Sequence, residues 1–137
     1  MATAIDSCVI FDILTDHPDY GPLSMKAVQE AGIKGALVIS EPVYTELVSF
    51  FDKAAQLDSF LSSCEIRTEA VGLDGCREAG RRHARYRKSG GPRTRILTDF
   101  LIAGHALASA MPLLTRDDGF YRKHFTGLRI IDPENSP

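Results

Sequence analysis

Four acidic residues stand out in this chain because of the apolar surroundings in which they occur. Asp6 and Asp117 each lie just beyond a short apolar run, and Glu46 and Asp99 each interrupt the apolar stripe of a predicted helix. A carboxylate that points toward a core is costly to bury in its ionised form, and metal ions are effective partners for it. A cluster of four carboxylates could hold one or two divalent cations and support phosphoryl-transfer chemistry.

Helical periodicity places Glu46 on an inward face. It shares one side of a predicted helix, at the spacing i, i+3, i+4 and i+7, with Val43, Leu47 and Phe50. The alternative for Glu46 is a salt bridge at the boundary of the core.

Asp99 occupies a similar position near the start of a later predicted helix. The same spacing relates it to Ile102, Ala103 and Ala106, so its side chain is expected on the apolar face. A carboxylate near a helix N-terminus is also favoured by the helix dipole. A capping or dipole role is therefore the alternative for Asp99.

Asp6 and Asp117 each follow a predicted strand. The carboxyl ends of parallel strands form the ligand crevice of an open sheet, although either acid alone could be a turn or N-cap residue. Four converging carboxylates would raise one another's pKa unless a cation lay among them. Mg²⁺ suits this set better than Ca²⁺ or Zn²⁺, because it takes few carboxylates, keeps several waters and pairs with phosphate.

The elements that must position these acids alternate along the chain, as in an α/β domain with a mainly parallel sheet. Strands are predicted at residues 3–6, 36–39, 65–68, 113–115 and 128–131. Helices are predicted after the first strand to residue 14 and at residues 23–31, 41–51 (with Ser40 as N-cap), 52–63, 73–88 and 96–109. The apolar side of the 73–88 helix is expected to comprise Leu73, Cys76, Ala79, His83 and Tyr86.

Length and composition indicate one globular domain over residues 1–137, with a frayed tail at 131–137. The start of the chain has no basic segment typical of a targeting peptide, and the longest apolar stretch contains Asp99, His105 and Pro112, so no membrane span is expected. Three cysteines without metal-ligand spacing indicate reduced, buried thiols in a cytoplasmic protein.

Four short motifs, in order, resemble those of the PIN-domain ribonucleases, especially the small VapC-like toxins of toxin–antitoxin pairs. The motifs are IDSCVIFDIL, EPVYTEL, ILTDFLIAGHA and LLTRDDGFYRKHF, and the resemblance extends from Ala4 to Ile131. It implies a compact α/β/α sandwich, RNA cleavage dependent on Mg²⁺ or Mn²⁺, a homodimer, and inhibition by a co-expressed antitoxin.

The resemblance also assigns roles to individual residues. It implies that Asp6, Glu46, Asp99 and Asp117 are the acidic metal-site residues. Ser7 and Thr115 match the small hydroxyl residues that accompany the first and last acids. Cys8 stands where the family often has Asn. The sequence TRD favours Asp117 over Asp118 as the last acid and leaves Asp118 as a possible helix N-cap.

A basic segment could hold the RNA beside this acidic site. Residues 77–95 contain eight Arg and Lys residues against one acid, and Arg77, Arg81, Arg85 and Lys88 form one helical stripe. The candidate RNA contacts are Arg85, Arg93, Arg95 and Arg116. The stripe could instead be a solvated face or bind an acidic antitoxin segment. Tyr86 and Tyr121 could stack on bases or pack in the core.

The hypothesis is hydrolysis of an RNA phosphodiester by water activated on a metal, with Asp6 and Asp99 as the strongest ligands and either one or two ions. One alternative is a Mg²⁺-dependent phosphatase of the haloacid dehalogenase type, which requires an Asp-x-Asp pair that Asp6-Ser7-Cys8 does not provide. Another is a non-catalytic PIN-fold module that binds RNA or protein.

Overall fold

Five strands form a single sheet in the computed structural model, which describes residues 1–92 and 97–135. The strands are β1 (Thr3–Ile5), β2 (Leu37–Ser40), β3 (Ile66–Glu69), β4 (Leu113–Leu114) and β5 (Ile130–Ile131). Their order in the sheet is β3-β2-β1-β4-β5, and every neighbouring pair is parallel. The predicted α/β class and parallel sheet are confirmed.

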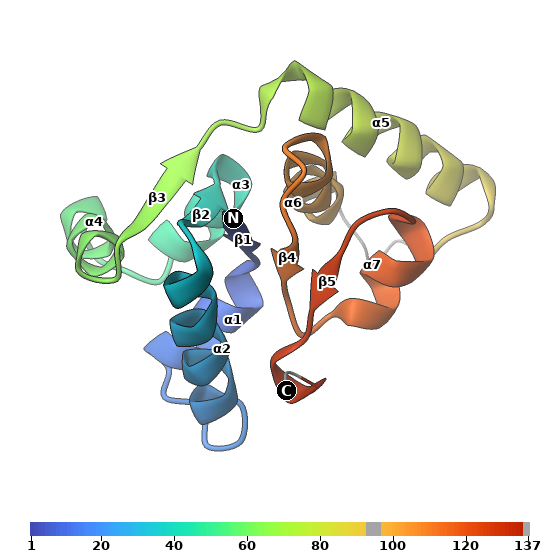
Figure 1. Ribbon diagram of the computed structural model, residues 1–137. Coiled ribbons are helices and arrows are strands. Elements are labelled where there is room, and N and C mark those ends of the chain that lie inside the picture. Colours follow the sequence, from blue (N-terminus) through green and yellow to red (C-terminus); the bar gives the residue numbers. More distant parts are fainter. Residues whose placement is uncertain (93–96, 136–137) are drawn as a thin grey trace.

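In the described part of the chain, seven α-helices and one short 3₁₀-helix connect and follow these strands. They are α1 (Ser7–Leu14), α2 (Gly21–Lys34), α3 (Glu41–Val48), α4 (Ala54–Ser63), α5 (Gly72–Lys88), α6 (Leu97–Ala108), α7 (Asp118–His124) and η1 (Pro133–Asn135). Helices α1 and α2 lie together on one side of the strands, and α5, α6 and α7 lie on the opposite side (Figure 1). This is the α/β/α arrangement of a sheet covered on both faces.

The chain changes direction within the sheet between β1 and β4. Strands β1 to β3 succeed one another toward one edge, and the chain then returns past β1 to build β4 and β5 at the other edge. Register is fixed by pairing Ala4 with Val38 on one side and with Leu113 on the other. Right-handed crossovers place their helices on one face of the sheet while strands are added in one direction, and on the other face when the direction reverses. The helices of the two halves of the sheet therefore diverge between β1 and β4.

Strands β1, β2, β4 and β5 are largely apolar because both faces of the sheet are covered there, whereas the edge strand β3 exposes Arg67 and Thr68. Ile5, Val38, Ile39, Leu113 and Leu114 are all buried at the centre of the core. Burial of one such side chain contributes about 1.5–3 kcal/mol, so the strand ends that carry the acids are held on a rigid base.

Helix α5 packs only in part as the sequence predicted. Of its expected apolar side, Ala79 and Tyr86 are buried and His83 contacts Phe100, but Leu73 is 71% exposed and Cys76 is also exposed. The reason is a close approach of α5 and α6 through glycines: a Cβ on Gly104 would lie 2.5 Å from the carbonyl oxygen of Gly75. This contact turns the side of Gly75 and Ala79 toward α6 and directs Leu73 to solvent.

Some helix ends also differ from the sequence prediction. Ser40 precedes α3 as expected, but its hydroxyl makes no capping bond and is buried without a partner among the described residues. Phe50, expected on the inward face, is 48% exposed because α3 ends at Val48. Asp118 is the first residue of α7 and not its N-cap, and α7 was not predicted as a helix.

The C-terminal residues are more ordered than expected. Ile131 pairs in β5 and residues 133–135 form η1, within the segment for which the sequence predicted a frayed tail. All three cysteines are free, but Cys76 is exposed, which contradicts the expectation that all are buried. Within residues 1–92 and 97–135, none of the helices is both long and apolar enough to cross a membrane.

Candidate functional site

The candidate site lies at the carboxyl ends of β1 and β4. The chain leaves β1 toward one edge of the sheet and β4 toward the other edge. In open α/β sheets, ligands bind in the crevice between two such neighbouring strands. Asp6 follows β1 directly as the N-cap of α1, and its carboxylate accepts the Ser7 N–H. Thr115 and Asp117 follow β4 and lead into α7. The fold therefore brings together two acids from opposite ends of the sequence.

Asp6 is firmly held by its neighbours, and only 6% of its surface is exposed. Its Oδ1 accepts the Ser7 backbone N–H at 2.8 Å. Its Oδ2 accepts the Thr115 hydroxyl at 2.8 Å and the Tyr121 hydroxyl at 3.2 Å. Hydrogen bonds to an ionised carboxylate are among the stronger ones in proteins, so these donors fix the orientation of the Asp6 side chain.

Ser7 and Thr115 connect Asp6 to two of the other acids. The Ser7 hydroxyl donates to Glu46 Oε1 at 2.9 Å, while the Ser7 backbone is bonded to Asp6. Thr115 Oγ1 accepts the Asp117 backbone N–H at 3.0 Å while donating to Asp6. Each of these residues thus contacts the acidic residue that sequence reasoning paired with it, and also donates its hydroxyl to the carboxylate of a second one.

The charges of all four acids act on this site. Burial raises the pKa of Asp6 above its ordinary value, and the charge of Asp117 raises it further, while the three hydrogen bonds lower it. Burial likewise raises the pKa of Glu46; the Ser7 bond lowers it, and the charges of Asp6 and Asp99 raise it. The charge of Asp117 thus reaches Asp6, and that of Asp99 in α6 reaches Glu46, while a shared metal site of all four acids stays a prediction.

Tyr121 is a member of the site that the sequence reasoning did not identify as such. Its side chain is fully buried, its hydroxyl donates to Asp6, and burial together with the nearby carboxylates raises its pKa, so it stays protonated. The available signal was its spacing: Tyr121 lies four residues after Asp117 and therefore on the same side of α7. The burial is typical of the packing alternative and not of base stacking.

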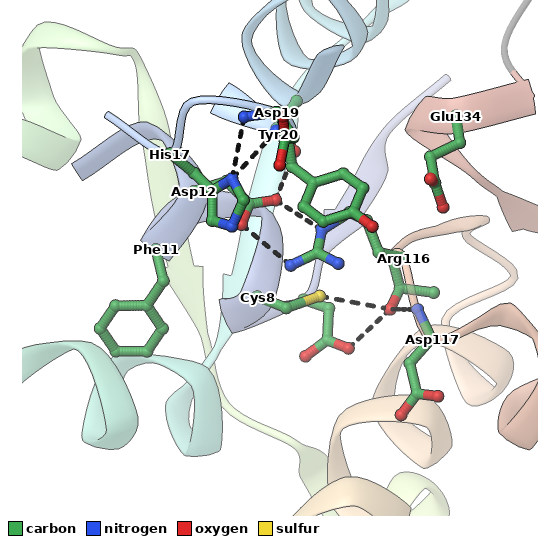
Figure 2. A network of polar contacts seen from close by, with 12 residues as sticks. Cys8, Phe11, Asp12, His17, Asp19, Tyr20, Arg116, Asp117 and Glu134 are labelled. Atoms are coloured by element: carbon green, nitrogen blue, oxygen red, sulfur yellow. Dashed lines mark hydrogen bonds and ion pairs between the residues drawn. The ribbon is translucent and has the colours of Figure 1, made fainter. Parts of the chain in front are cut away.

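Cys8 lies beside the same hydrogen bonds. Its Sγ is 3.6 Å from Thr115 Oγ1, and burial, followed by the charge of Asp6, raises its pKa to about 12. Cys8 is therefore a neutral thiol and a weak hydrogen-bonding partner for Thr115. Figure 2 shows Cys8, Arg116 and Asp117 around this part of the site.

The donor set fits a hard divalent cation. Every candidate ligand is a carboxylate oxygen, the type that Mg²⁺ and Mn²⁺ prefer. Burial first, and then the charges of neighbouring acids, raise the pKa values of Asp6 and Glu46. Asp6 Oδ2 accepts two hydroxyl bonds, while Oδ1 accepts the Ser7 N–H at 2.8 Å and lies 3.4 Å from the Ser7 hydroxyl. Across the described ranges, the side chains do not form a ready-made cluster of three or more metal ligands.

The predicted RNA contacts occupy different places. Arg85 lies on the exposed side of α5, with Arg77, Arg81 and Lys88. Arg116 instead pairs with Asp12, a buried acid in α1 that sequence reasoning did not single out. Arg93 and Arg95 lie outside the described residues. The signal for Asp12 was a charged residue within the apolar run of α1.

Comparisons with known proteins identify the type of domain. The sequence profile of the PIN domain family matches residues 3–125 of this chain. No curated protein sequence matches it.

Solved structures with the same fold cover nearly the whole chain. One is VapBC2 from Rickettsia felis bound to a DNA fragment from their promoter, with 22% sequence identity over 96% of this chain and 98% of that chain, and a TM-score of 0.75. Another is VapBC-1 from nontypeable Haemophilus influenzae, with 20% identity over 98% and 100% and a TM-score of 0.76. DNA-bound VapBC from Salmonella typhimurium has 18% identity over 97% and 99% and a TM-score of 0.76. At these identities the likeness shows a common fold.

Proposed function

Because this chain belongs to the PIN domain family, we propose that it is a metal-dependent endoribonuclease and the toxin of a toxin–antitoxin pair. The observation that carries the proposal is the buried Asp6 carboxylate at the switch point of the sheet, held by three donors and acted on by other acids. The VapBC structures that share the fold support the pairing with an antitoxin. A homodimer and a cytoplasmic site of action are part of the same proposal.

The proposed metal ligands are Asp6 and Asp99, with Glu46 and Asp117 completing the site directly or through water. The ion is Mg²⁺ or Mn²⁺. When bound, such an ion supplies Lewis-acid chemistry: it makes water a stronger nucleophile at neutral pH and neutralises charge on a phosphodiester.

The chain's own contribution is orientation and a water-poor environment. Thr115 and Tyr121 hold one oxygen of Asp6 and Ser7 holds the other, so the carboxylate would be presented to a cation in a fixed orientation. Ser7 keeps Glu46 beside Asp6. Burial strengthens every electrostatic interaction among these groups, including their attraction for a cation. No side chain has to act as the nucleophile.

The proposed RNA contacts supply the positive charge that the acidic site lacks. Arg77, Arg81, Arg85 and Lys88 line the exposed side of α5 and would neutralise phosphates without reading sequence. Arg93 and Arg95, which precede α6 and Asp99 in the chain, remain predicted contacts from the sequence. The same four basic residues of α5 are equally suited to bind an acidic antitoxin segment. Competition between RNA and antitoxin for the protein would show that both use this surface.

One alternative function has an observation in its favour. Both oxygens of Asp6 accept hydrogen bonds within the protein, and the described side chains form no ready-made metal cluster, as in a PIN-fold module that binds RNA or protein without cleaving it. Titration calorimetry with Mn²⁺ separates the two functions, because a non-catalytic module should bind the metal poorly. Membership of the PIN domain family removes the ground for the phosphatase alternative.

The decisive experiment is incubation of the purified protein, free of antitoxin, with total RNA and Mn²⁺ or Mg²⁺. We expect discrete fragments that disappear with EDTA and with Asp99→Asn. Asp52→Asn, which removes an exposed acid outside the site, is the matched control and should cleave normally. A folded wild-type protein that binds Mn²⁺ but cleaves no RNA would contradict the ribonuclease proposal.

A further inference from the structure

Arg116 and Asp12 form a tightly engaged ion pair next to the candidate site. Arg116 Nε donates to Asp12 Oδ2 at 2.6 Å, and an Arg116 terminal nitrogen donates to Oδ1 at 2.9 Å. The Ser24 hydroxyl from α2 donates to the same Asp12 Oδ2 at 2.8 Å, and the Arg116 guanidinium lies 4.0 Å from the ring centre of Tyr20. Figure 2 shows the guanidinium enclosed between Asp12 and Tyr20.

This arrangement fixes Arg116 in position and orientation. The Asp12 side chain is only 5% exposed and that of Arg116 is 25% exposed. A buried carboxylate needs a partner of good geometry, and the planar guanidinium provides two parallel bonds while its face stacks on an aromatic ring. Two of its donor groups and one face are thus occupied within the protein.

The position of Arg116 in the sequence gives this pair its importance. It lies between Thr115, which donates to Asp6, and Asp117, whose backbone N–H is bonded to Thr115 Oγ1. Asp12 belongs to α1, the helix that Asp6 caps. The ion pair therefore ties the turn after β4 to the helix after β1, and these are the two segments that contribute Asp117 and Asp6.

We propose that Arg116 and Asp12 are positioning residues that hold Thr115 and Asp117 against Asp6 for metal binding. This assigns Arg116 a role different from the RNA contact predicted from the sequence, and it rests on the proposed function. The term clamp is used below for Arg116, Asp12, Tyr20 and Ser24.

The first test needs neither metal nor RNA. Amide-resolved hydrogen exchange of the Asp117 N–H reports directly on its bond to Thr115. Arg116→Lys keeps the charge but loses the planar fork, and we expect the Asp117 amide to exchange about tenfold faster or more in this variant. Loss of a contact that orients a metal ligand has effects of this size. If Arg116→Lys folds poorly, Tyr20→Leu replaces it in the experiment. This milder change leaves the ion pair in place and should also make the Asp117 amide exchange faster.

A matched control is available in a second Arg–carboxylate pair. Arg67 in β3 donates through Nε and a terminal nitrogen to Glu69 Oε2, far from the candidate site in the strand order. Arg67→Lys should leave the Asp117 exchange rate unchanged.

The second test separates positioning from phosphate contact. A positioning role predicts that Arg116→Lys and Asp12→Asn each weaken Mn²⁺ binding by roughly tenfold and lower kcat, with KM for RNA unchanged. The double variant should be no worse than the more damaging single variant, because both changes break one pair. A phosphate contact predicts instead a higher KM for Arg116→Lys and a salt dependence reduced by about one unit.

The outcomes are distinct. An unchanged Asp117 exchange rate with a raised KM would overturn the clamp and restore Arg116 as an RNA contact. Loss of thermal stability with unchanged Mn²⁺ affinity and exchange would show that the pair is merely structural, which also overturns the proposal. If wild-type protein neither binds Mn²⁺ nor cleaves RNA, the proposed function fails, and the exchange experiment still decides whether the clamp holds the turn.

Discussion

Replacement of Tyr121 by Phe isolates one hydrogen bond of the candidate site. The phenyl ring keeps its place between the neighbouring aromatic residues Phe120 and Phe125. The change removes only the hydroxyl that donates to Asp6 Oδ2. Because the ring volume is conserved, no cavity is created, and the result reports on the bond itself.

The magnitude follows from the charge and the distance. A hydrogen bond to a charged group contributes about 1.5–3 kcal/mol, and the 3.2 Å separation is long for an O–H···O bond. We therefore expect Tyr121→Phe to lower the free energy of unfolding by about 1.5 kcal/mol near neutral pH. Asp6 would keep its bonds from Ser7 and Thr115, but Mn²⁺ affinity should fall by about 10-fold or more, because Asp6 is oriented less firmly.

The pH dependence of this effect has a definite sign. Burial raises the pKa of Asp6 above its ordinary value of 3.8, so the folded protein binds this proton more tightly than the unfolded chain. The stability of the metal-free protein should therefore fall as the pH rises from about 4 through the raised pKa of Asp6. Loss of the Tyr121 bond, which lowers that pKa, extends the fall to higher pH, so the difference between variant and wild type grows with pH across this window.

Urea unfolding followed by circular dichroism, with and without Mn²⁺, measures both effects; the chain has no Trp to serve as a probe. The matched control is Tyr44→Phe, which removes a tyrosine hydroxyl that donates to Asp58 at 2.7 Å on the exposed surface. That variant should resemble wild type in stability and in Mn²⁺ binding. The reasoning is refuted if Tyr121→Phe also matches wild type in both, or if its stability difference shrinks as the pH rises.

Three further predictions concern other parts of the chain. Asp99→Asn should abolish Mn²⁺ binding and cleavage while leaving the metal-free fold intact or slightly more stable, since like-charge repulsion is removed; calorimetry and urea unfolding test this. Gly104→Ala should lower the free energy of unfolding by about 1–3 kcal/mol because its Cβ would lie 2.5 Å from the Gly75 carbonyl oxygen, and an unchanged denaturation midpoint would contradict this close packing. Iodoacetamide should modify exposed Cys76 well before Cys8, whose pKa is raised to about 12; mass spectrometry of timed samples gives the order, and the reverse order would contradict it.

The sequence was most informative where one element determines the result. Alternating apolar runs and helical stripes predicted the class and the approximate position of each strand. The rule for parallel sheets then predicted that Asp6 and Asp117, which follow strands, would lie at one edge of the sheet. Helix α7 escaped prediction because it has only seven residues and a weak apolar pattern.

The sequence was least informative where two distant segments determine the result. Arginine side chains are usually exposed, so the sequence did not indicate a partner for Arg116. Only the contact between α1 and the turn after β4 shows that this partner is Asp12. The hydrogen bond from Tyr121 to Asp6 likewise depends on how α7 lies against the end of β1. The outward turn of Leu73 depends on the glycine contact between α5 and α6, which no single-helix pattern contains.

The place of β1 in the sheet has a consequence for how the chain folds during synthesis. β1 is made first, yet one of its two neighbours, β4, begins only at Leu113. Until that residue is made, one edge of an apolar strand has no partner, and an unpaired apolar edge promotes aggregation. Asp6 must also wait for Thr115 and Tyr121, so the acidic centre can be completed only late in synthesis.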